Sequence, residues 1–250
     1  VEHLGKNVYM RCTGMSVAAI RCQLTEMPDG MFDHCTSLTK ITMADSIKNN
    51  IRRIGVGTFY DCPKLTTFAF GDSVAKIDAC GFMGCTGLGK VTLPESVKHI
   101  GHDAFSACQK MSEINIPANV DSIGDHAFKD AHALKQITMS DSVKYLGEQA
   151  FAYCQNLTSA KISKNITEIR FKTFAGCTKL TDFTLSPNIT IIADSAFQGV
   201  KCFDTLKLSN LNSVGDYAFA DCGKLKYVYM PEKLRKIGNY TFKGDSIEQY

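Results

Sequence analysis

Residues 88–108 read LGKVTLPESVKHIGHDAFSAC, and this stretch carries the pattern that decides the fold. After the anchor Leu88, the apolar residues Val91 and Leu93 alternate with a polar one, as expected of a short strand with one buried side. Pro94 ends the strand, because proline has no backbone N–H to donate to a neighbouring strand. The closing segment, Gly-x-x-Ala-Phe-x-x-Cys, predicts a helical or 3₁₀ turn that brings its Phe and Cys near one face.

The phenylalanine of this unit recurs along the whole chain. Its steps are 27, 23, 23, 23, 23, 23, 23, 22 and 23 residues. The positions are Phe32, Phe59, Phe82, Phe105, Phe128, Phe151, Phe174, Phe197, Phe219 and Phe242. Tyr9 lies 23 residues before Phe32 in the same role, which makes about eleven repeats. Self-similarity at such a period is typical of solenoids.

Other positions recur in step with the phenylalanine. An aliphatic residue lies five positions before it, and Leu or a similar residue lies six positions after it. Cysteine lies three positions after it in eight repeats, at Cys12, Cys35, Cys62, Cys85, Cys108, Cys154, Cys177 and Cys222. One repeat alone cannot bury these side chains, whereas stacked repeats bury them in one continuous core. The sequence therefore predicts a solenoid with parallel strands about 4.8 Å apart.

The repeats organise residues 1–250 as a single domain. Residues 1–23 form a degenerate first repeat or N-terminal cap, which solenoids need for solubility. Residues 237–250 form a shortened last repeat, and Tyr250 stands just inside the next expected strand. The 27-residue step holds an insertion near residues 48–52, where we expect a bulged loop.

The repeat resembles the BspA-like, or Treponema pallidum-type, class of leucine-rich repeats. The residues that carry this resemblance are Leu88, Val91, Leu93, Pro94, Ser96, Val97, Ile100, Gly101, Ala104, Phe105 and Cys108. The expected fold is a leucine-rich-repeat solenoid of the α/β horseshoe class. It has a parallel sheet on the concave face, and short helical or 3₁₀ turns and extended segments on the convex face. The resemblance further implies a cell-surface or secreted protein that acts in adhesion, and it brings no motif of functional residues.

Composition and motifs exclude several classes of function. The net charge of +3 is too small for the basic face that neutralises nucleic-acid phosphates. No apolar run approaches the roughly 18 residues of a membrane helix, and residues 1–9 do not read as a signal peptide. Gly-x-Ser-x-Gly, His-Glu-x-x-His and a phosphate-binding glycine loop are all missing. We therefore expect neither an enzyme nor a cofactor.

The cysteines are expected to be free thiols. Those of the repeated column are read as small buried hydrophobic residues, and Cys-x-x-Cys pairs suited to zinc do not occur. Cys22, Cys80 and Cys202 lie off the column and are candidates for exposed thiols. Cys80 and Cys85 are expected to face opposite sides, so no disulfide is predicted between them.

Histidine and aspartate form a block in two neighbouring repeats. In register, His102 stacks on Asp125 and Asp103 stacks on His126, on the predicted convex side. Such a set could bind zinc, since both residue types are zinc ligands. The favoured interpretation is a solvated patch with weak ion pairs.

The predicted concave face carries the candidate binding residues. The outward strand positions near the C-terminus are Lys161, Thr184, Lys207, Tyr227 and Tyr229. Tyrosine is enriched among binding hot spots, and it is also simply a good strand former. Four Asn-x-Ser/Thr sequons lie at Asn156, Asn165, Asn188 and Asn239. They matter only in a eukaryotic secretory setting, and the repeat itself supplies Asn and Thr there.

Three functional hypotheses follow. The first is a cell-surface or secreted adhesion module that binds a protein or glycan, such as a host or extracellular-matrix protein, through the concave face. The second is an architectural spacer that carries another domain, suggested by the chain ending at Tyr250. The third is a metal-dependent enzyme built on the His–Asp block.

Overall fold

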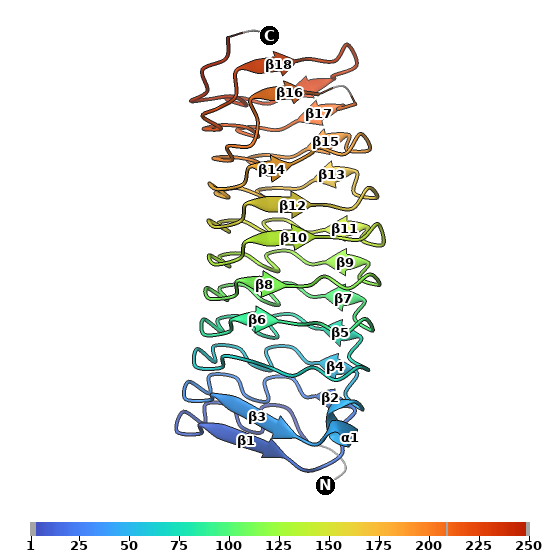
Figure 1. The fold of residues 1–250 in the computed structure, drawn as a ribbon, viewed down its shortest axis with the longest axis vertical. Coiled ribbons are helices and arrows are strands. Elements are labelled where there is room, and N and C mark those ends of the chain that lie inside the picture. The colour runs from blue at the N-terminus through green and yellow to red at the C-terminus, as the bar shows by residue number, and fades with distance from the viewer. Residues whose placement is uncertain (1–3, 209, 249–250) are drawn as a thin grey trace.

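The computed structural model describes residues 4–208 and 210–248, which wind into an elongated stack of similar turns (Figure 1). The N-terminus lies at one end of the stack and the C-terminus at the other (Figure 1). The expectations for the two chain ends partly concern residues 1–3 and Tyr250, which lie outside the described residues. Each turn of chain therefore contacts the turns before and after it, as in a repeat protein.

The predicted strand of the repeat forms one column of parallel strands, here called the first strand column. It contains β1 (Val17–Ile20), β3 (Lys40–Met43), β6 (Lys90–Val91), β8 (Glu113–Ile114), β10 (Gln136–Thr138), β12 (Ser159–Lys161), β14 (Asp182–Phe183), β16 (Thr205–Lys207) and β18 (Tyr227–Tyr229). Partners lie one repeat apart, as in the pair Lys90–Glu113. The column is hydrogen-bonded in four sections, β1–β3, β6–β8, β10–β12–β14 and β16–β18.

A second column of parallel strands runs beside the first (Figure 1). It contains β2 (Glu26–Met27), β4 (Arg53–Ile54), β5 (Lys76–Ile77), β7 (His99–Ile100), β9 (Ser122–Ile123), β11 (Tyr145–Leu146), β13 (Glu168–Ile169), β15 (Ile191–Ile192), β17 (Ser213–Val214) and β19 (Lys236–Ile237). In β7 the first residue is exposed and the second is buried. The aliphatic residue five positions before each Phe thus belongs to a strand, which the sequence analysis did not anticipate.

No helix forms around the phenylalanine in the described residues; the chain makes single turns with i→i−3 hydrogen bonds, such as that of 3.1 Å from the Ser106 N–H to the Asp103 carbonyl. Two residues of each turn have left-handed backbones, such as Asp103 (φ 52°) and Ala107 (φ 58°), and no helix accommodates them. The backbone N–H groups of Asp103, Phe105 and Ala107 instead donate to carbonyls of the next repeat over 2.8–2.9 Å. The turns therefore form a third ladder of hydrogen bonds between repeats. Because these bonds run between repeats, they satisfy backbone groups that a helix would satisfy within one repeat.

The inserted segment of the 27-residue step forms the helix α1 (Asp45–Lys48). It is the one helix among the residues that the structure describes, and Ile47 anchors it in the core. The loop expected at residues 48–52 follows this helix: residues 49–50 form a turn and residues 51–52 are irregular. The structure supports a parallel solenoid, but not the convex-face helices of an α/β horseshoe.

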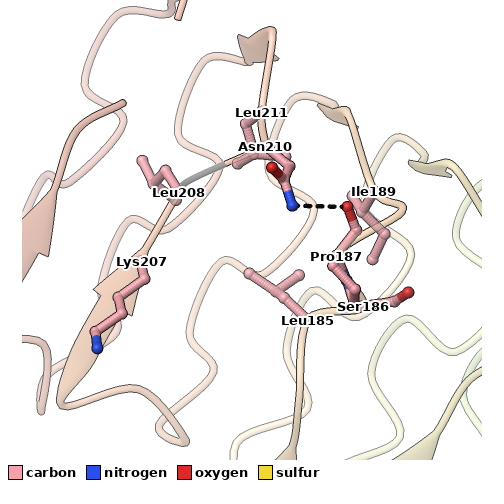
Figure 2. Close-up of a pocket in the computed structure, with 8 residues that line it drawn as sticks. All are labelled: Leu185, Ser186, Pro187, Ile189, Lys207, Leu208, Asn210 and Leu211. Carbon is pink, nitrogen blue, oxygen red and sulfur yellow. Dashed lines mark hydrogen bonds between the residues drawn. The ribbon is translucent and has the colours of Figure 1, made fainter. Parts of the chain in front are cut away.

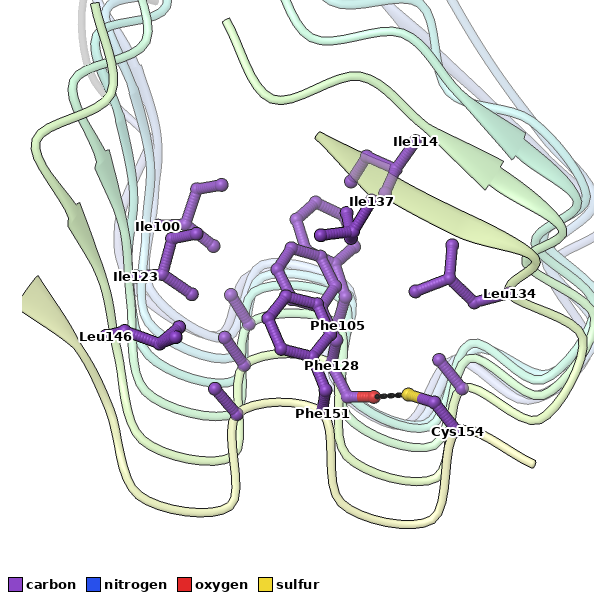
Figure 3. Close-up of a cluster of buried hydrophobic side chains, with 14 of the residues drawn as sticks. Ile100, Phe105, Ile114, Ile123, Phe128, Leu134, Ile137, Leu146, Phe151 and Cys154 are labelled. Carbon is purple, nitrogen blue, oxygen red and sulfur yellow. Dashed lines mark hydrogen bonds between the residues drawn. The ribbon is translucent and has the colours of Figure 1, made fainter. Parts of the chain in front are cut away.

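The core is a ladder of aromatic rings. Successive phenylalanines stack with centroids 5.0–5.9 Å apart, and Tyr9 extends the stack at 5.4 Å from Phe32. Around Phe105, Phe128 and Phe151 the aliphatic residues of both strand columns close the core from two sides (Figure 3). Each ring buries on the order of 150–250 Å² of surface, so this stack dominates the hydrophobic stabilisation.

The column cysteines lie in the same core as free thiols. The thiol of Cys154 donates a hydrogen bond of 3.2 Å to the backbone carbonyl of Phe128 (Figure 3), and that of Cys177 donates to Phe151 over 3.1 Å. Burial raises the pKa of Cys177 to about 12, so this thiol stays protonated and unreactive. The expectation of small buried residues is confirmed for seven of the eight column cysteines, with the addition of a weak hydrogen bond between repeats, whereas Cys12 in the first repeat is only partly buried. Cys22, Cys80 and Cys202 are half-buried rather than fully exposed.

Candidate ligand-binding surface and histidine cluster

Four of the five candidate binding residues form one exposed row on the first strand column. Lys161, Thr184, Lys207 and Tyr229 hold equivalent positions in successive repeats, and Lys207 is the direct register partner of Tyr229. Tyr229 is the most open of the strand tyrosines, with 51% of its surface exposed. We call these four residues the C-terminal row. Parallel strands place them within reach of one ligand.

Tyr227 differs from the C-terminal row in its environment. It is half-buried, pairs in register with Thr205, and donates a hydrogen bond of 3.1 Å to a carboxylate oxygen of Glu248. This hydrogen bond to Glu248 raises the pKa of the Tyr227 hydroxyl. The hydroxyl is therefore engaged within the chain, which leaves Tyr229 as the freer tyrosine of β18.

Two adjoining pockets lie beside the C-terminal row, and we call them the paired pockets. The first, of about 170 Å³, is lined by Leu185, Ser186, Pro187, Ile189, Lys207, Leu208, Asn210 and Leu211 (Figure 2). The second, of about 530 Å³, is lined by Met139, Ser140, Asp141, Lys161, Ile162, Lys164, Thr184, Leu185, Ser186, Pro187 and Asn188. They share Leu185, Ser186 and Pro187. Three residues of the row thus stand at the edge of the paired pockets, of which the larger, beside Lys161 and Thr184, is mainly apolar, and sequence reasoning did not find them.

The charges at the paired pockets are mostly positive. Lys164 forms an ion pair of 3.3 Å with Asp141. Lys161 and Lys207 form no ion pair within residues 4–208 and 210–248. The surface can therefore take up an acidic group of a ligand beside an apolar side chain.

The His–Asp block is a cluster of three residues rather than four. Nε2 of His102 lies 2.7 Å from Oδ2 of Asp103, and Nδ1 of His126 lies 3.6 Å from the same oxygen. Asp125 turns away, and its Oδ1 accepts hydrogen bonds of 2.9 Å from the Tyr145 hydroxyl and from the Glu148 backbone N–H. The carboxylate of Asp125, the register counterpart of His102, is therefore engaged with the next repeat and does not join the cluster.

The sequons take part in contacts between repeats. The side-chain amides of Asn156, Asn165 and Asn188 each donate to a backbone carbonyl one repeat earlier, at 2.7, 2.5 and 2.9 Å. Asn239 is exposed. Three of the four sequons thus have a structural use that needs no glycan.

Sequence reasoning also missed an ionic cross-link near the N-terminus. Arg53 donates to Glu26 at 3.0 Å, to Asp29 at 2.7 Å and to Asp78, which joins three repeats. Although burial raises the pKa of Asp29, hydrogen bonds from Lys6 and Arg53 lower it to about 2. This network has the properties of a structural clamp, since its charges are already satisfied by one another.

The stacked turns, the two parallel strand columns and the phenylalanine ladder define the protein as a leucine-rich-repeat solenoid. The chain belongs to the BspA-type leucine-rich repeat family, whose model matches residues 1–50, 52–181 and 123–248 in six copies. Proteins of this family are generally not enzymes, and leucine-rich-repeat domains generally mediate protein binding. No curated protein sequence matches the chain significantly. Among residues 4–208 and 210–248, no helix is long and apolar enough to cross a membrane.

Two bacterial proteins of known structure share this fold. A leucine-rich repeat protein from Bacteroides ovatus is similar with a TM-score of 0.52 and 23% identity, over 98% of this chain and 80% of that one. The T. pallidum leucine-rich repeat protein is similar with a TM-score of 0.50 and 28% identity, over 66% of this chain and 67% of that one. These similarities support the parallel-sheet solenoid.

Proposed function

We propose that this chain is a binding module of a cell-surface or secreted protein and that it recognises a protein partner through the C-terminal row and the paired pockets. The observation that carries the proposal is the presence, beside the paired pockets, of two lysines that have no ion pair among the described residues. Lys161 and Lys207 are exposed, and Leu185 and Pro187 line both pockets. This places cationic groups next to apolar surface, the combination that binds an acidic segment carrying apolar side chains.

The backbone under the row suits a binding role. The stacked repeats share one core and three hydrogen-bonded ladders, so the outward residues sit on an ordered support. Binding to an ordered surface loses less conformational entropy than binding to a mobile loop. Tyr229 adds a large, rigid aromatic side chain with only two side-chain torsions to restrain, a residue type typical of hot spots.

The partner is proposed to be a host or extracellular-matrix protein, or a glycan carried by one. A binding screen of the purified chain against such molecules tests this. The decisive variant is Lys161→Ala, Lys207→Ala and Tyr229→Ala together. A matched control variant, Lys40→Ala, Lys90→Ala and Tyr145→Ala, removes the same residue types from exposed strand positions elsewhere.

We expect the decisive variant to weaken binding by at least about tenfold, or about 1.4 kcal/mol, while the control variant binds like the parent. Equal affinities of all three proteins for a partner would refute the proposed site while leaving the binding function in place. Absence of any partner would favour the alternative, an architectural spacer whose rigid stack displays another domain.

A further inference from the structure

We propose that His102, Asp103 and His126 form a binding site for a divalent transition-metal ion of the zinc class. This inference is independent of the proposed binding function, because the cluster lies on the turn ladder and not on the first strand column. It rests on the convergence of three ligand atoms from two repeats. In residues 4–208 and 210–248, this is the one group of three or more such side chains that meets the distances of a metal site.

The ligand atoms are already close to the separations that zinc requires. One nitrogen of each histidine and one carboxylate oxygen of Asp103 all lie within 4.8 Å of one another. Zinc holds nitrogen and oxygen ligands at about 2.0–2.2 Å in a tetrahedron, which sets donor atoms about 3.3 Å apart. Small rotations of the side chains therefore bring the three donors onto one ion. The two imidazole rings, with centroids 5.0 Å apart, meet edge to face and do not obstruct this movement.

The repeat places these residues together through its backbone. Asp103 and His126 occupy the same left-handed position two residues before the phenylalanine, with φ of 52° and 57°. A backbone hydrogen bond of 2.9 Å from Asp103 N–H to the Asp125 carbonyl joins the two turns. His102 precedes Asp103 and brings the third donor. Since the backbone is held by the ladder, binding an ion costs only side-chain ordering.

A fourth residue orients one of the ligands. The side-chain amide of Gln149, one repeat further along the same row, lies 2.8 Å from Nε2 of His126. An amide can donate or accept by turning its plane, so it can hold the tautomer in which Nδ1 is free to bind metal. Metal-binding histidines almost always have such a partner on the other ring nitrogen. His102 is exposed, which leaves a fourth coordination position open to water.

A second His–Asp group, around His34, does not have the convergent geometry of the proposed site. His34 contacts Asp33 through Nδ1 and Asp61 through Nε2, the latter at 3.7 Å. The two carboxylates therefore lie against opposite nitrogens of one ring and cannot share an ion with it. At the proposed site both histidines address the same oxygen of Asp103.

The test is a calorimetric titration of the full chain with Zn²⁺ in metal-free buffer with a non-thiol reductant. The variants are Asp103→Asn and His126→Asn, because asparagine tolerates the left-handed backbone of both positions. The matched control is Asp130→Asn, which makes the same charge change at a left-handed position (φ 58°) beside His132. His102→Gln, outside the left-handed row, keeps the test valid if either asparagine variant misfolds.

We expect the parent and Asp130→Asn to bind one Zn²⁺ per chain with equal affinity. Asp103→Asn, His126→Asn and His102→Gln are each expected to weaken binding by about tenfold or more. Unchanged affinity in Asp103→Asn would overturn the proposal. Loss of binding in Cys80→Ser with none in Asp103→Asn would overturn it as well, by assigning the metal to the half-buried thiol one repeat away.

Discussion

The N-terminal and C-terminal halves of the first strand column share a backbone and differ in surface chemistry. In β6 and β8, Lys90 forms an ion pair of 2.9 Å with Glu113, so the outward charges neutralise each other. In β12 and β16, Lys161 and Lys207 stand two residues further along the repeat than Lys90 and Glu113 and have no such partner in the described part of the chain, while pockets adjoin both pairs of residues. The buried positions therefore form the same core in both halves. The two halves differ in the outward side chains that a ligand would contact.

The first strand column is interrupted between β3 and β6, and the packing there can also be compared with that of the C-terminal half. Phe68 and Phe70 occupy the strand position between β3 and β6, where no strand is assigned. The ring of Phe68 lies 5.1 Å from Phe59 and 5.4 Å from Phe82, so it joins the core ladder. Phe183, the equivalent residue of the C-terminal half, lies 5.2 Å from both Phe174 and Phe197, so both halves use an aromatic residue at this position to extend the core ladder.

The largest expected effect tests whether the phenylalanine core contributes similarly to the stability of the two halves. Phe105→Ala and Phe197→Ala are each expected to lower the free energy of unfolding by about 3–5 kcal/mol, because each removes a fully buried ring. Phe197 also contacts Phe183 and Phe203, so its loss should cost more. Urea denaturation measures both. Losses below about 1 kcal/mol at either site would refute the aromatic ladder as the common support.

A second prediction concerns the charge of the C-terminal row, to which one substitution adds a carboxylate. Thr184→Glu places a carboxylate between Lys161 and Lys207, as Glu113 stands beside Lys90. We expect the affinity for an acidic partner to fall by about tenfold, with the free energy of unfolding unchanged within about 0.5 kcal/mol. Binding measured at low and high salt checks this, with Thr184→Gln as the uncharged control. If Thr184→Glu and Thr184→Gln bind alike, the unpaired charges do not govern recognition.

A third prediction concerns the end of the cysteine column. Asp245 takes the place of the cysteine in the last repeat, and burial raises its pKa from 3.8 to about 6. Because the folded state binds the proton more tightly, the resulting stabilisation is full below about pH 4 and is lost as the pH rises through 6. Partial exposure limits the effect to about 1 kcal/mol.

Asp245→Cys restores the column and should remove this pH dependence, which melting temperatures between pH 4 and pH 8 would show. Asp204→Asn serves as the control, because Asp204 is an exposed aspartate that is not among the groups that shift the pKa of Asp245. An unchanged pH profile in Asp245→Cys would exclude Asp245 as its source.

The smallest expected effect comes from the exposed ion pair of the N-terminal half. Glu113→Thr should leave the urea midpoint unchanged, because such pairs contribute little in water. It should, however, free Lys90 and make the N-terminal surface resemble the C-terminal one. Binding of an acidic peptide to Glu113→Thr, in the background that lacks Lys161, Lys207 and Tyr229, measures this gain. A large drop in stability would show that the pair is structural.

Sequence reasoning predicted those features that depend on repetition alone. A column such as Phe105 and Phe128 is visible because identical residues return at one period, and stacking is the only way to bury them. The second strand column was missed because its strands have two residues, too few for an alternating pattern. The turns were misjudged because left-handed residues such as Ala107 have no consistent residue type.

Sequence reasoning predicted the candidate site only in part, because some of its contacts do not follow from the repeat pattern. The C-terminal row followed from strand alternation, since side chains at equivalent positions of parallel strands point the same way. The paired pockets did not, because they form between the strand ends and following loops of two or three adjacent repeats. The departure of Asp125 from the His–Asp block also depends on a backbone N–H of Glu148 in the next repeat.

The amino-acid sequence by itself determined the period, the parallel stacking, the phenylalanine core and the buried cysteines, because these follow from matching the repeat to itself. The tertiary structure alone decided which outward side chains meet. Lys90 finds Glu113 one repeat away, while Asp103 gathers two histidines. These contacts depend on rotamers and local hydrogen bonds between turns, which a residue pattern does not encode.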